Sequence, residues 1–501
     1  PMNKIAPGEF SITIPLADIG TFRAKTCFFP TNSKKPYWPE GGDVIIKTAP
    51  AWTAAHTSVY TAFPRQFHPA FVSKNENPLP NSEALTEHDR NGWTIIPPSG
   101  TFRDLIKKLD TILNIERFRI IQLLPIHPTP TTYAKMGRYG SPFAGTDFLA
   151  VDPALAEFDT SATPLDQFRE LVNAVHSYGA RIFLDLPANH TGWASTLQTH
   201  HPEWFKRNHD GCFHSPGAWG IVWEDLVELD YSKPELKQFI ASVFEFWCGQ
   251  GVDGFRCDAG YMVPADVWRY VVAHVRRRFP DTVFLLEGLG GKISVTRQLI
   301  SDEGLDWAYS ELFQTEDRSA FENYLPNALK MSYETGPLTN FAETHDNCRM
   351  AAKSNAYAKL RTALAALSAH QGCFGITNGV EWFATQKVDV HGASALNWDA
   401  ESNQVHHLSR LNCIISNHPA FGPGAAVGMV QYGAGNSLAL VRTPACSNDI
   451  DGQREFDNNE KVLVLVNLDA TNQQNVSWGT HEFHINPDTC IDLLEGKEIK
   501  L

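Results

Sequence analysis

Carboxylate side chains follow several apolar, strand-like runs of this sequence, and they are its strongest chemical signal. Asp185 lies near the end of RIFLDLP, Asp258 ends VDGFRCD, Glu287 follows VFLL, and Asp346 stands beside His345. A buried carboxylate must be paired or neutralised, so such a set at strand ends is more than packing needs. Two carboxyl groups, one ionised and one protonated, are the machinery that cleaves glycosidic bonds.

The neighbours of these carboxylates indicate different roles. Arg256 and Asp258 are two residues apart, so on a strand both side chains point the same way. The guanidinium would lower the pKa of Asp258 and keep it ionised, which suits a nucleophile. Glu287 follows an apolar run, and burial raises the pKa of a carboxyl group, which suits a general acid. We expect His345 to help hold Asp346 as a third carboxylate.

The elements that must position these residues are strands alternating with helices from about residue 57 onward. Apolar residues recur with helical spacing in QFRELVNAVHSYG (167–179) and PELKQFIASVFEFW (234–247). Strand-like runs begin at residues 58, 118, 181, 252, 282, 305, 339 and 373. This alternation predicts an α/β fold with a closed (β/α)₈ barrel. Catalytic groups of this fold lie at the C-terminal ends of the strands, so the carboxylates should converge at the barrel mouth.

Three parts are predicted along the chain. Residues 1–56 form a β-rich segment in which SITIPL, CFFP and DVIIKTA resemble short strands. Residues 57–424 form the barrel, and residues 425–501 form a C-terminal all-β domain. The stretch 187–233 is too long for a tight turn and is interpreted as a small subdomain inserted after strand three. The strand-like run GTDFLAVD (145–152) is interpreted as part of a loop.

Four segments then carry a family resemblance. DLPANH (185–190), GFRCD (254–258), FLLEG (284–288) and ETHDN (343–347) resemble, in order and spacing, the four signature regions of the α-amylase family, glycoside hydrolase family 13. The resemblance spans roughly residues 58–500. It implies a retaining mechanism, with Asp258 as nucleophile, Glu287 as acid/base and Asp346 as the carboxylate that stabilises the distorted sugar in the transition state.

The same resemblance implies which residues surround the sugar in the −1 subsite, next to the cleaved bond. These are Arg256, His190 and His345, with Phe143 of GRYGSPFAGTDF (137–148) at the position of a stacking aromatic residue. The family commonly has Tyr there, so this chain lacks that hydroxyl group. Asp185 is included in the substrate-binding set, with the ordering of the loop around His190 as its expected role.

Other residues near these motifs have two interpretations. Trp193, Trp219 and Trp223 of the inserted subdomain would either stack on sugar faces or pack its core. Cys257 alternates with its neighbours along a strand and is expected to be a packing residue. Glu381 and Trp382, after the eighth strand, are expected near the mouth on the acceptor side.

Hydrolysis and transfer use the same three carboxylates, so these motifs leave the acceptor open. The first prediction is a retaining glycosidase of the amylase type that cleaves α-1,4-glucosidic bonds. The alternative is a 4-α-glucanotransferase or maltosyltransferase of glycogen metabolism. HPEWF (201–205) and FRCD resemble bacterial maltosyltransferases that build glucan from maltose 1-phosphate, and GTFRAKTCFF loosely resembles the start of the transferase half of glycogen-debranching enzymes. A non-catalytic carbohydrate-binding protein is disfavoured, because such relatives typically lose one or more of these carboxylates.

Composition excludes several partners. The 42 basic and 56 acidic residues give a net charge of −14, which argues against nucleic acid and anionic membranes and suits an uncharged α-glucan or maltooligosaccharide. No apolar run approaches the ~18 residues of a membrane span, and PMNKIAPGEFSITIPL has no signal-peptide core. The nine cysteines contain no CxxC pair. We therefore expect a cytoplasmic protein.

We expect no cofactor, with calcium as the one alternative. A calcium ligand of many amylases corresponds to Asn189 in this sequence. The inserted subdomain is short and poor in aspartate, so it offers few further oxygen ligands of the kind that calcium prefers.

Overall fold

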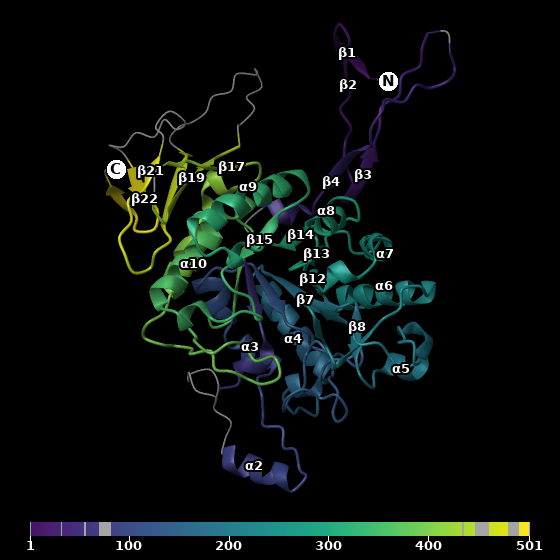
Figure 1. Cartoon of the computed structure of the whole chain (residues 1–501), viewed down its shortest axis with the longest axis vertical. Coiled ribbons are helices and arrows are strands. Elements are labelled where there is room, and N and C mark those ends of the chain that lie inside the picture. Colours follow the sequence, from purple (N-terminus) through teal and green to yellow (C-terminus); the bar gives the residue numbers. More distant parts are fainter. Residues whose placement is uncertain are drawn as a thin grey trace.

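A closed barrel of eight parallel strands forms the centre of the protein, which confirms the predicted (β/α)₈ fold (Figure 1). The computed structural model describes residues 2–31, 33–54, 57–69, 82–432, 435–445, 460–478 and 490–499. In chain order the barrel strands are β5 (Val59–Ala62), β6 (Ile120–Leu123), β7 (Arg181–Pro187), β12 (Gly254–Asp258), β13 (Val283–Leu286), β14 (Trp307–Tyr309), β15 (Leu338–Phe341) and β16 (Phe374–Thr377). Each begins within two residues of its predicted start.

The barrel strands are buried on both faces, as the apolar runs predicted. Every residue of β6, β13 and β16 is buried, because helices cover the outside and side chains fill the inside. The barrel closes where β16 pairs with β5, with Gly375 opposite Val59. The C-terminal ends of all eight strands therefore meet at one face.

Local sequence signals determine where several of the outer helices begin. α4 (Pro164–Ser177) follows Thr163, whose hydroxyl accepts from the backbone N–H of Asp166 in a capping box, and proline occupies the first helical position. α3 (Phe102–Ile106) also begins with a capping box, at Thr101. The other outer helices are α6 (Pro234–Gly249), α7 (Ala265–Arg276), α8 (Ile293–Ser301), α9 (Arg318–Glu334), α10 (Asn355–Ser368) and α11 (Val405–Asn417). None of the helices in the described ranges is both long and apolar enough to cross a membrane.

The segment after β7 leaves the barrel and returns at α6. β8 (His190–Gly192) pairs antiparallel with β11 (Leu226–Glu228), so that His190 lies opposite Glu228. Between them lie α5 (Thr196–His200) and a small hairpin of β9 (Gly217–Ala218) and β10 (Ile221–Val222). The run 145–152 forms turns without strand pairing, as the loop interpretation expected.

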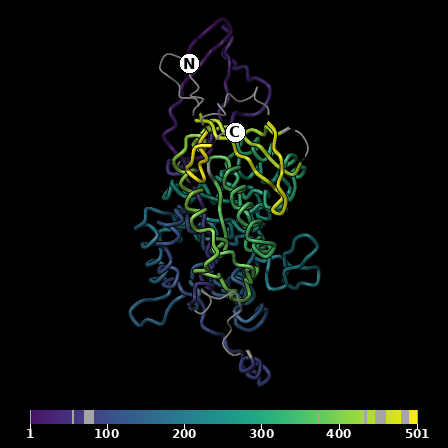
Figure 2. The backbone as a smooth tube through the Cα atoms, turned by 90° about the vertical axis from the view of Figure 1, so that its left-hand side faces the viewer, coloured from purple at the N-terminus to yellow at the C-terminus, as the bar shows by residue number. Residues whose placement is uncertain are grey.

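The N-terminal segment forms two antiparallel hairpins that protrude from one end of the molecule, whereas α2 (Ser82–Arg90) protrudes from the other (Figures 1 and 2). β1 (Asn3–Ala6) pairs with β2 (Glu9–Ser11), and β3 (Gly20–Ala24) pairs with β4 (Val44–Thr48). DVIIKTA is thus a strand. The predicted strands SITIPL and CFFP are wrong, because only one residue of each run is paired. Both runs contain proline, which lacks the amide hydrogen that strand pairing requires.

The C-terminal region is β-rich and packs on α9 and α10. Its main sheet consists of β17 (Ala426–Met429), β19 (Ser437–Thr443) and β20 (Val462–Asn467), and two strand pairs, β18 (Gln431–Tyr432) with β21 (Ser477–Trp478) and β22 (Cys490–Asp492) with β23 (Lys497–Ile499), flank it. Leu438 and Leu440 pack with Phe321, Leu325 and Leu364 in one apolar cluster. Residues 446–459 and 479–489 of the predicted C-terminal domain lie outside the described residues. The domain boundaries at 56 and 424 stay predictions.

Arg442 of β19 joins this sheet to the barrel. Its side chain is fully buried, and it donates hydrogen bonds of 3.0 Å to the carbonyl oxygens of Leu367, Ala369 and Ala420. The guanidinium also lies 3.9 Å from the centre of the Phe421 ring. One side chain therefore satisfies three backbone acceptors from the end of α10 and the segment after α11.

We predict that Arg442→Ala lowers the free energy of unfolding by about 3 kcal/mol or more, because three buried carbonyls lose their donor and a cavity opens. Urea unfolding followed by circular dichroism measures this change. Arg277→Ala, at an exposed position just after α7, is the control and should change stability by less than ~0.5 kcal/mol. Equal unfolding midpoints for both variants would contradict the role of Arg442.

Candidate active site

A buried ion triad lies at the C-terminal ends of β7 and β12. Arg256 is 2% exposed, and its Nη1 donates to Asp185 Oδ1 at 2.9 Å, to Asp185 Oδ2 at 2.7 Å and to Asp258 Oδ1 at 2.7 Å. Asp185 and Arg256 are register partners on adjacent strands, so the barrel itself brings them together. Asp185 has no exposed surface. It reaches a sugar only through Arg256, so the structure places it as a positioning residue rather than as a direct contact.

Asp258 presents one carboxylate oxygen away from the arginine. Its Oδ1 is bound to Arg256, while Oδ2 lies 3.9 Å from His190 Nε2. His190 is buried, and burial lowers its pKa more than the charges of Asp258 and its acidic neighbours raise it. A neutral imidazole beside Oδ2 leaves that oxygen available for attack on a sugar carbon.

Glu287 is held by two backbone amides. Its Oε2 accepts from the N–H of Ala259 at 2.9 Å, and its Oε1 accepts from the N–H of Leu289 at 3.0 Å. Burial raises the pKa of Glu287 to about 7, and the charge of Asp258 adds to this effect, while Arg256 and the two amides oppose it. Glu287 also follows Leu286, whose partner across the ladder is Cys257. Glu287, the candidate acid, is the residue after Leu286, and it therefore lies beside Asp258, the residue after Cys257.

His345, Asp346 and Phe143 complete the wall around Arg256. The rings of Phe143 and His345 stack with centroids 5.3 Å apart and an interplanar angle of 14°, and Arg256 lies 5.9 Å from the Phe143 ring centre. His345 Nε2 lies 3.5 Å from Asp346 Oδ2, and the Asp346 side chain is 65% exposed. Desolvation raises the pKa of Asp346. The charges of His345, Arg256 and Lys387 lower it by more, so the pKa lies below its usual value.

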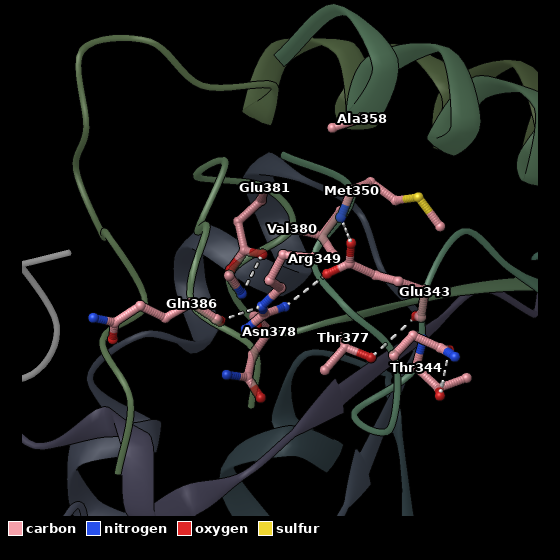
Figure 3. Close-up of polar contacts among 12 residues, drawn as sticks. Glu343, Thr344, Arg349, Met350, Ala358, Thr377, Asn378, Val380, Glu381 and Gln386 are labelled. Atoms are coloured by element: carbon pink, nitrogen blue, oxygen red, sulfur yellow. Dashed lines mark hydrogen bonds and ion pairs between the residues drawn. The ribbon is translucent and has the colours of Figure 1, made fainter. Parts of the chain in front are cut away.

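A polar network fixes the turn that carries His345 and Asp346 (Figure 3). Glu343 accepts from Arg349 Nη1 at 2.9 Å and from the backbone N–H of Met350. Arg349 also donates to the carbonyl oxygens of Asn378 and Gln386, at 2.8 and 3.0 Å. Arg349 thereby ties the loop after β15 to the loop after β16 and holds the third carboxylate in place.

Two features of the site had no clear signal in the sequence. Ala259 adopts a left-handed backbone conformation (φ 45°), which is costly for a residue with a Cβ atom and is concentrated at functional sites. This conformation accompanies the amide contact to Glu287. Tyr309, at the end of β14, lies with its ring centre 5.3 Å from the Arg256 guanidinium and accepts from Gln122 Nε2 at 3.0 Å. Only its position at a strand end could have indicated it.

The expectation for Glu381 and Trp382 is wrong. Glu381 has no exposed surface and accepts from the Tyr60 hydroxyl at 2.6 Å and from the Gly379 N–H at 2.8 Å. Trp382 is 6% exposed and packs against Trp398. Both side chains are buried, so neither is accessible to an acceptor sugar. Cys257, by contrast, is a buried core residue as predicted.

The three tryptophans of the insertion differ in environment. Trp193 packs against Phe213 and Tyr133, and its indole N–H donates to the Glu224 carbonyl oxygen. Trp223 makes an edge contact with His190, with ring centroids 6.3 Å apart. Trp219 is 68% exposed. Trp193 therefore packs the subdomain, whereas Trp219 presents its indole to solvent.

The residues around Asn189 do not fit a calcium site. The side-chain amide of Asn189 lies against Met262, with 3.8 Å between Nδ2 and Sδ. Calcium prefers six to eight oxygen ligands. Within the described ranges, no cluster of three or more His, Cys, Asp or Glu side chains is arranged to hold a metal ion. No step of the chemistry below is assigned to a metal.

The chain is similar to known proteins in both sequence and structure. No family model matches the chain. Among curated proteins it is similar to an alpha-1,4-glucan:maltose-1-phosphate maltosyltransferase of Rhodospirillum rubrum, with 25% identity over 396 residues, covering 74% of this chain and 54% of that protein. A protein of the same name from Burkholderia pseudomallei is 31% identical over 402 residues, covering 75% of this chain and 34% of its own length. The chain thus spans about half the length of the first of these relatives.

Solved structures share the fold. An alpha-amylase from Lactobacillus plantarum superposes with a TM-score of 0.61 at 22% identity, covering 83% of this chain and 99% of that one. A debranching enzyme from Nostoc punctiforme gives 0.62 at 19% identity, covering 88% and 94%. The barrel and the carboxylates at its mouth are consistent with an enzyme that acts on glycosidic bonds. The chain is similar to proteins of the α-amylase family.

We predict that kcat/KM falls tenfold per pH unit as pH rises above about 7, because Glu287 must be protonated to donate to the leaving group and its pKa is raised to about 7. Initial rates on a maltooligosaccharide between pH 5 and 9 measure this limb. Glu287→Gln should lose the activity, and a flat profile up to pH 9 in the wild-type protein would rule out Glu287 as the acid.

Proposed function

We propose that this chain is a retaining α-glucan transglycosylase, which moves a maltosyl or glucosyl unit from an α-linked donor to a hydroxyl group of an α-glucan. The arrangement of Asp258, Glu287 and Asp346 around the buried Arg256 supports the double displacement, which transfer shares with hydrolysis. The maltosyltransferase names of the relatives support transfer over hydrolysis. Hydrolysis of the amylase type, our first prediction, becomes the second candidate. The cytoplasm stays the expected compartment.

The geometry supports a double displacement, in which a glycosyl-enzyme forms in one step and is resolved in a second. Asp258 Oδ2 attacks the anomeric carbon while the bond to the leaving oxygen breaks and Glu287 protonates that oxygen. The leaving group is phosphate from maltose 1-phosphate or a hydroxyl from a glucan. An acceptor hydroxyl then attacks the glycosyl-enzyme, Glu287 takes its proton, and the bond to Asp258 breaks. Asp346 stabilises the positively charged sugar. Arg256 orients the nucleophile.

An exposed aromatic residue lies beside the acid/base segment. Trp219, at the turn of the β9–β10 hairpin, has a left-handed backbone (φ 52°), and its indole lies directly over Gly290. A Cβ atom on Gly290 would be 2.4 Å from Trp219 Nε1. Gly290 is three residues after Glu287. Because leaving groups and acceptors bind on the side of the acid/base, we assign Trp219 to stacking on an acceptor sugar.

Product analysis with maltoheptaose separates the two candidates. We expect chains both longer and shorter than the substrate, and we expect release of inorganic phosphate when maltose 1-phosphate and glycogen are supplied together. Asp258→Asn should lower both rates by at least about 1,000-fold, since the covalent intermediate cannot form. Short products alone, without longer chains or phosphate release, would favour hydrolysis. A wild-type protein inactive on all these substrates would contradict both candidates.

We predict that Trp219→Ala lowers the ratio of transfer to hydrolysis by up to about tenfold, because an aromatic stacking contact contributes about 0.5–1.5 kcal/mol. The ratio is measured from the chain-length distribution of the products. Trp93→Ala, at a tryptophan that is 71% exposed just after α2, is the matched control and should leave the ratio unchanged. An unchanged ratio for Trp219→Ala would remove Trp219 from the acceptor site.

A further inference from the structure

A pocket lies at the end of the barrel opposite the carboxylates. It has a volume of about 490 Å³ and is lined by Trp52, Arg117, Arg119, Gly179, Arg181, Ser416 and Asn417. Arg119 directly precedes β6 and Arg181 is the first residue of β7. These are the N-terminal ends of the strands, whereas Asp258 and Glu287 follow the C-terminal ends. The pocket is therefore separate from the candidate active site.

Three guanidinium groups line this pocket in a chain whose net charge is −14. Arg181 donates to Asp253 Oδ1 at 2.9 Å and lies 5.4 Å from the ring centre of Trp52. Arg117 and Arg119 are exposed, and their guanidinium groups have no ion pair or hydrogen bond with any residue that the structure describes. Asp253 thus pairs with Arg181, whereas Arg117 and Arg119 have no ion-pair partner among the residues that the structure describes.

The backbone at Arg117 is strained and held from two sides. Its φ is 68°, a left-handed conformation that normally favours glycine and costs other residues about 1–3 kcal/mol. The adjacent Glu116 accepts on its carbonyl oxygen from Asn412 Nδ2 of α11 at 2.7 Å, and the N–H of Phe118 donates to the Ile112 carbonyl oxygen at 3.1 Å. Strain at a residue that lines a pocket indicates a functional role for Arg117.

We propose that this pocket binds a small phosphate ester. Guanidinium groups bind phosphate oxygens in pairs of parallel hydrogen bonds, and three arginine residues line this pocket. The volume falls within the ~300–1,000 Å³ typical of small-molecule sites. Trp52 supplies an apolar wall, and Ser416 and Asn417 at the end of α11 supply polar groups for the uncharged part of the ligand. A bound ester would connect the loop before β6 with α11.

Calorimetric titration of the 501-residue chain with inorganic phosphate, glucose 6-phosphate and ADP tests this site. We expect saturable binding of at least one ester that weakens at least tenfold in Arg117→Ala/Arg119→Ala and weakens with rising salt. Arg119→Gln, a single change at an exposed position, should weaken binding in the same direction if the double variant folds poorly. Arg277→Ala, at an exposed arginine after α7, should bind like the wild-type protein.

The ligands distinguish the sources of the phosphate group. Equal affinity for phosphate and both esters means that the pocket recognises phosphate alone, whereas tighter binding of glucose 6-phosphate or ADP identifies a sugar or a nucleotide ester. Asp258→Asn should retain the binding, which separates this pocket from the active site. Absence of saturable binding below about 10 mM, a limit near −3 kcal/mol, or equal affinity of the wild-type protein and both pocket variants would overturn the proposal.

Discussion

The buried contact of Arg256 with Asp185 and Asp258 is the constraint on which the rest of the site depends. Removing such charges from water costs several kcal/mol per ion, and here one guanidinium with three short hydrogen bonds to two carboxylates offsets that cost. The same contact orients Asp258 and leaves one of its oxygens toward the mouth. Phe143 and Tyr309 border the guanidinium, so the packing around Arg256 also shapes the space where a sugar ring would lie.

The two carboxylates that are candidates for nucleophile and acid lie in different surroundings. Asp258 touches Arg256 directly, whereas Glu287 is buried and its carboxylate is held by backbone amides, so that its pKa rises to about 7. Environments that separate two carboxyl groups in this way are the usual basis for acid and nucleophile roles. The strained Ala259 provides one of the amides. Backbone strain just after β12 is therefore linked to the ionisation of Glu287, which follows β13.

The acceptor side and the opposite end of the barrel depend on connections rather than on strands. Trp219 reaches Gly290 because the insertion after β7 folds back over the segment that follows Glu287. The arginine pocket exists because the loop before β6 lies against the end of α11. Loops at the two ends of one barrel can thus serve different ligands, since the strands between them form a packed core rather than a channel.

The sequence alone determined the barrel, the order of its strands and the catalytic candidates, because apolar runs and strand-end positions are local properties. It could not determine that Asp185 is fully buried against Arg256, that Glu381 and Trp382 are buried, or that SITIPL pairs only at Ser11. Those outcomes depend on contacts between distant segments, such as Glu381 with Tyr60. Tertiary structure decided burial and pairing, and burial decides which carboxyl group keeps its proton and which side chain can reach a sugar.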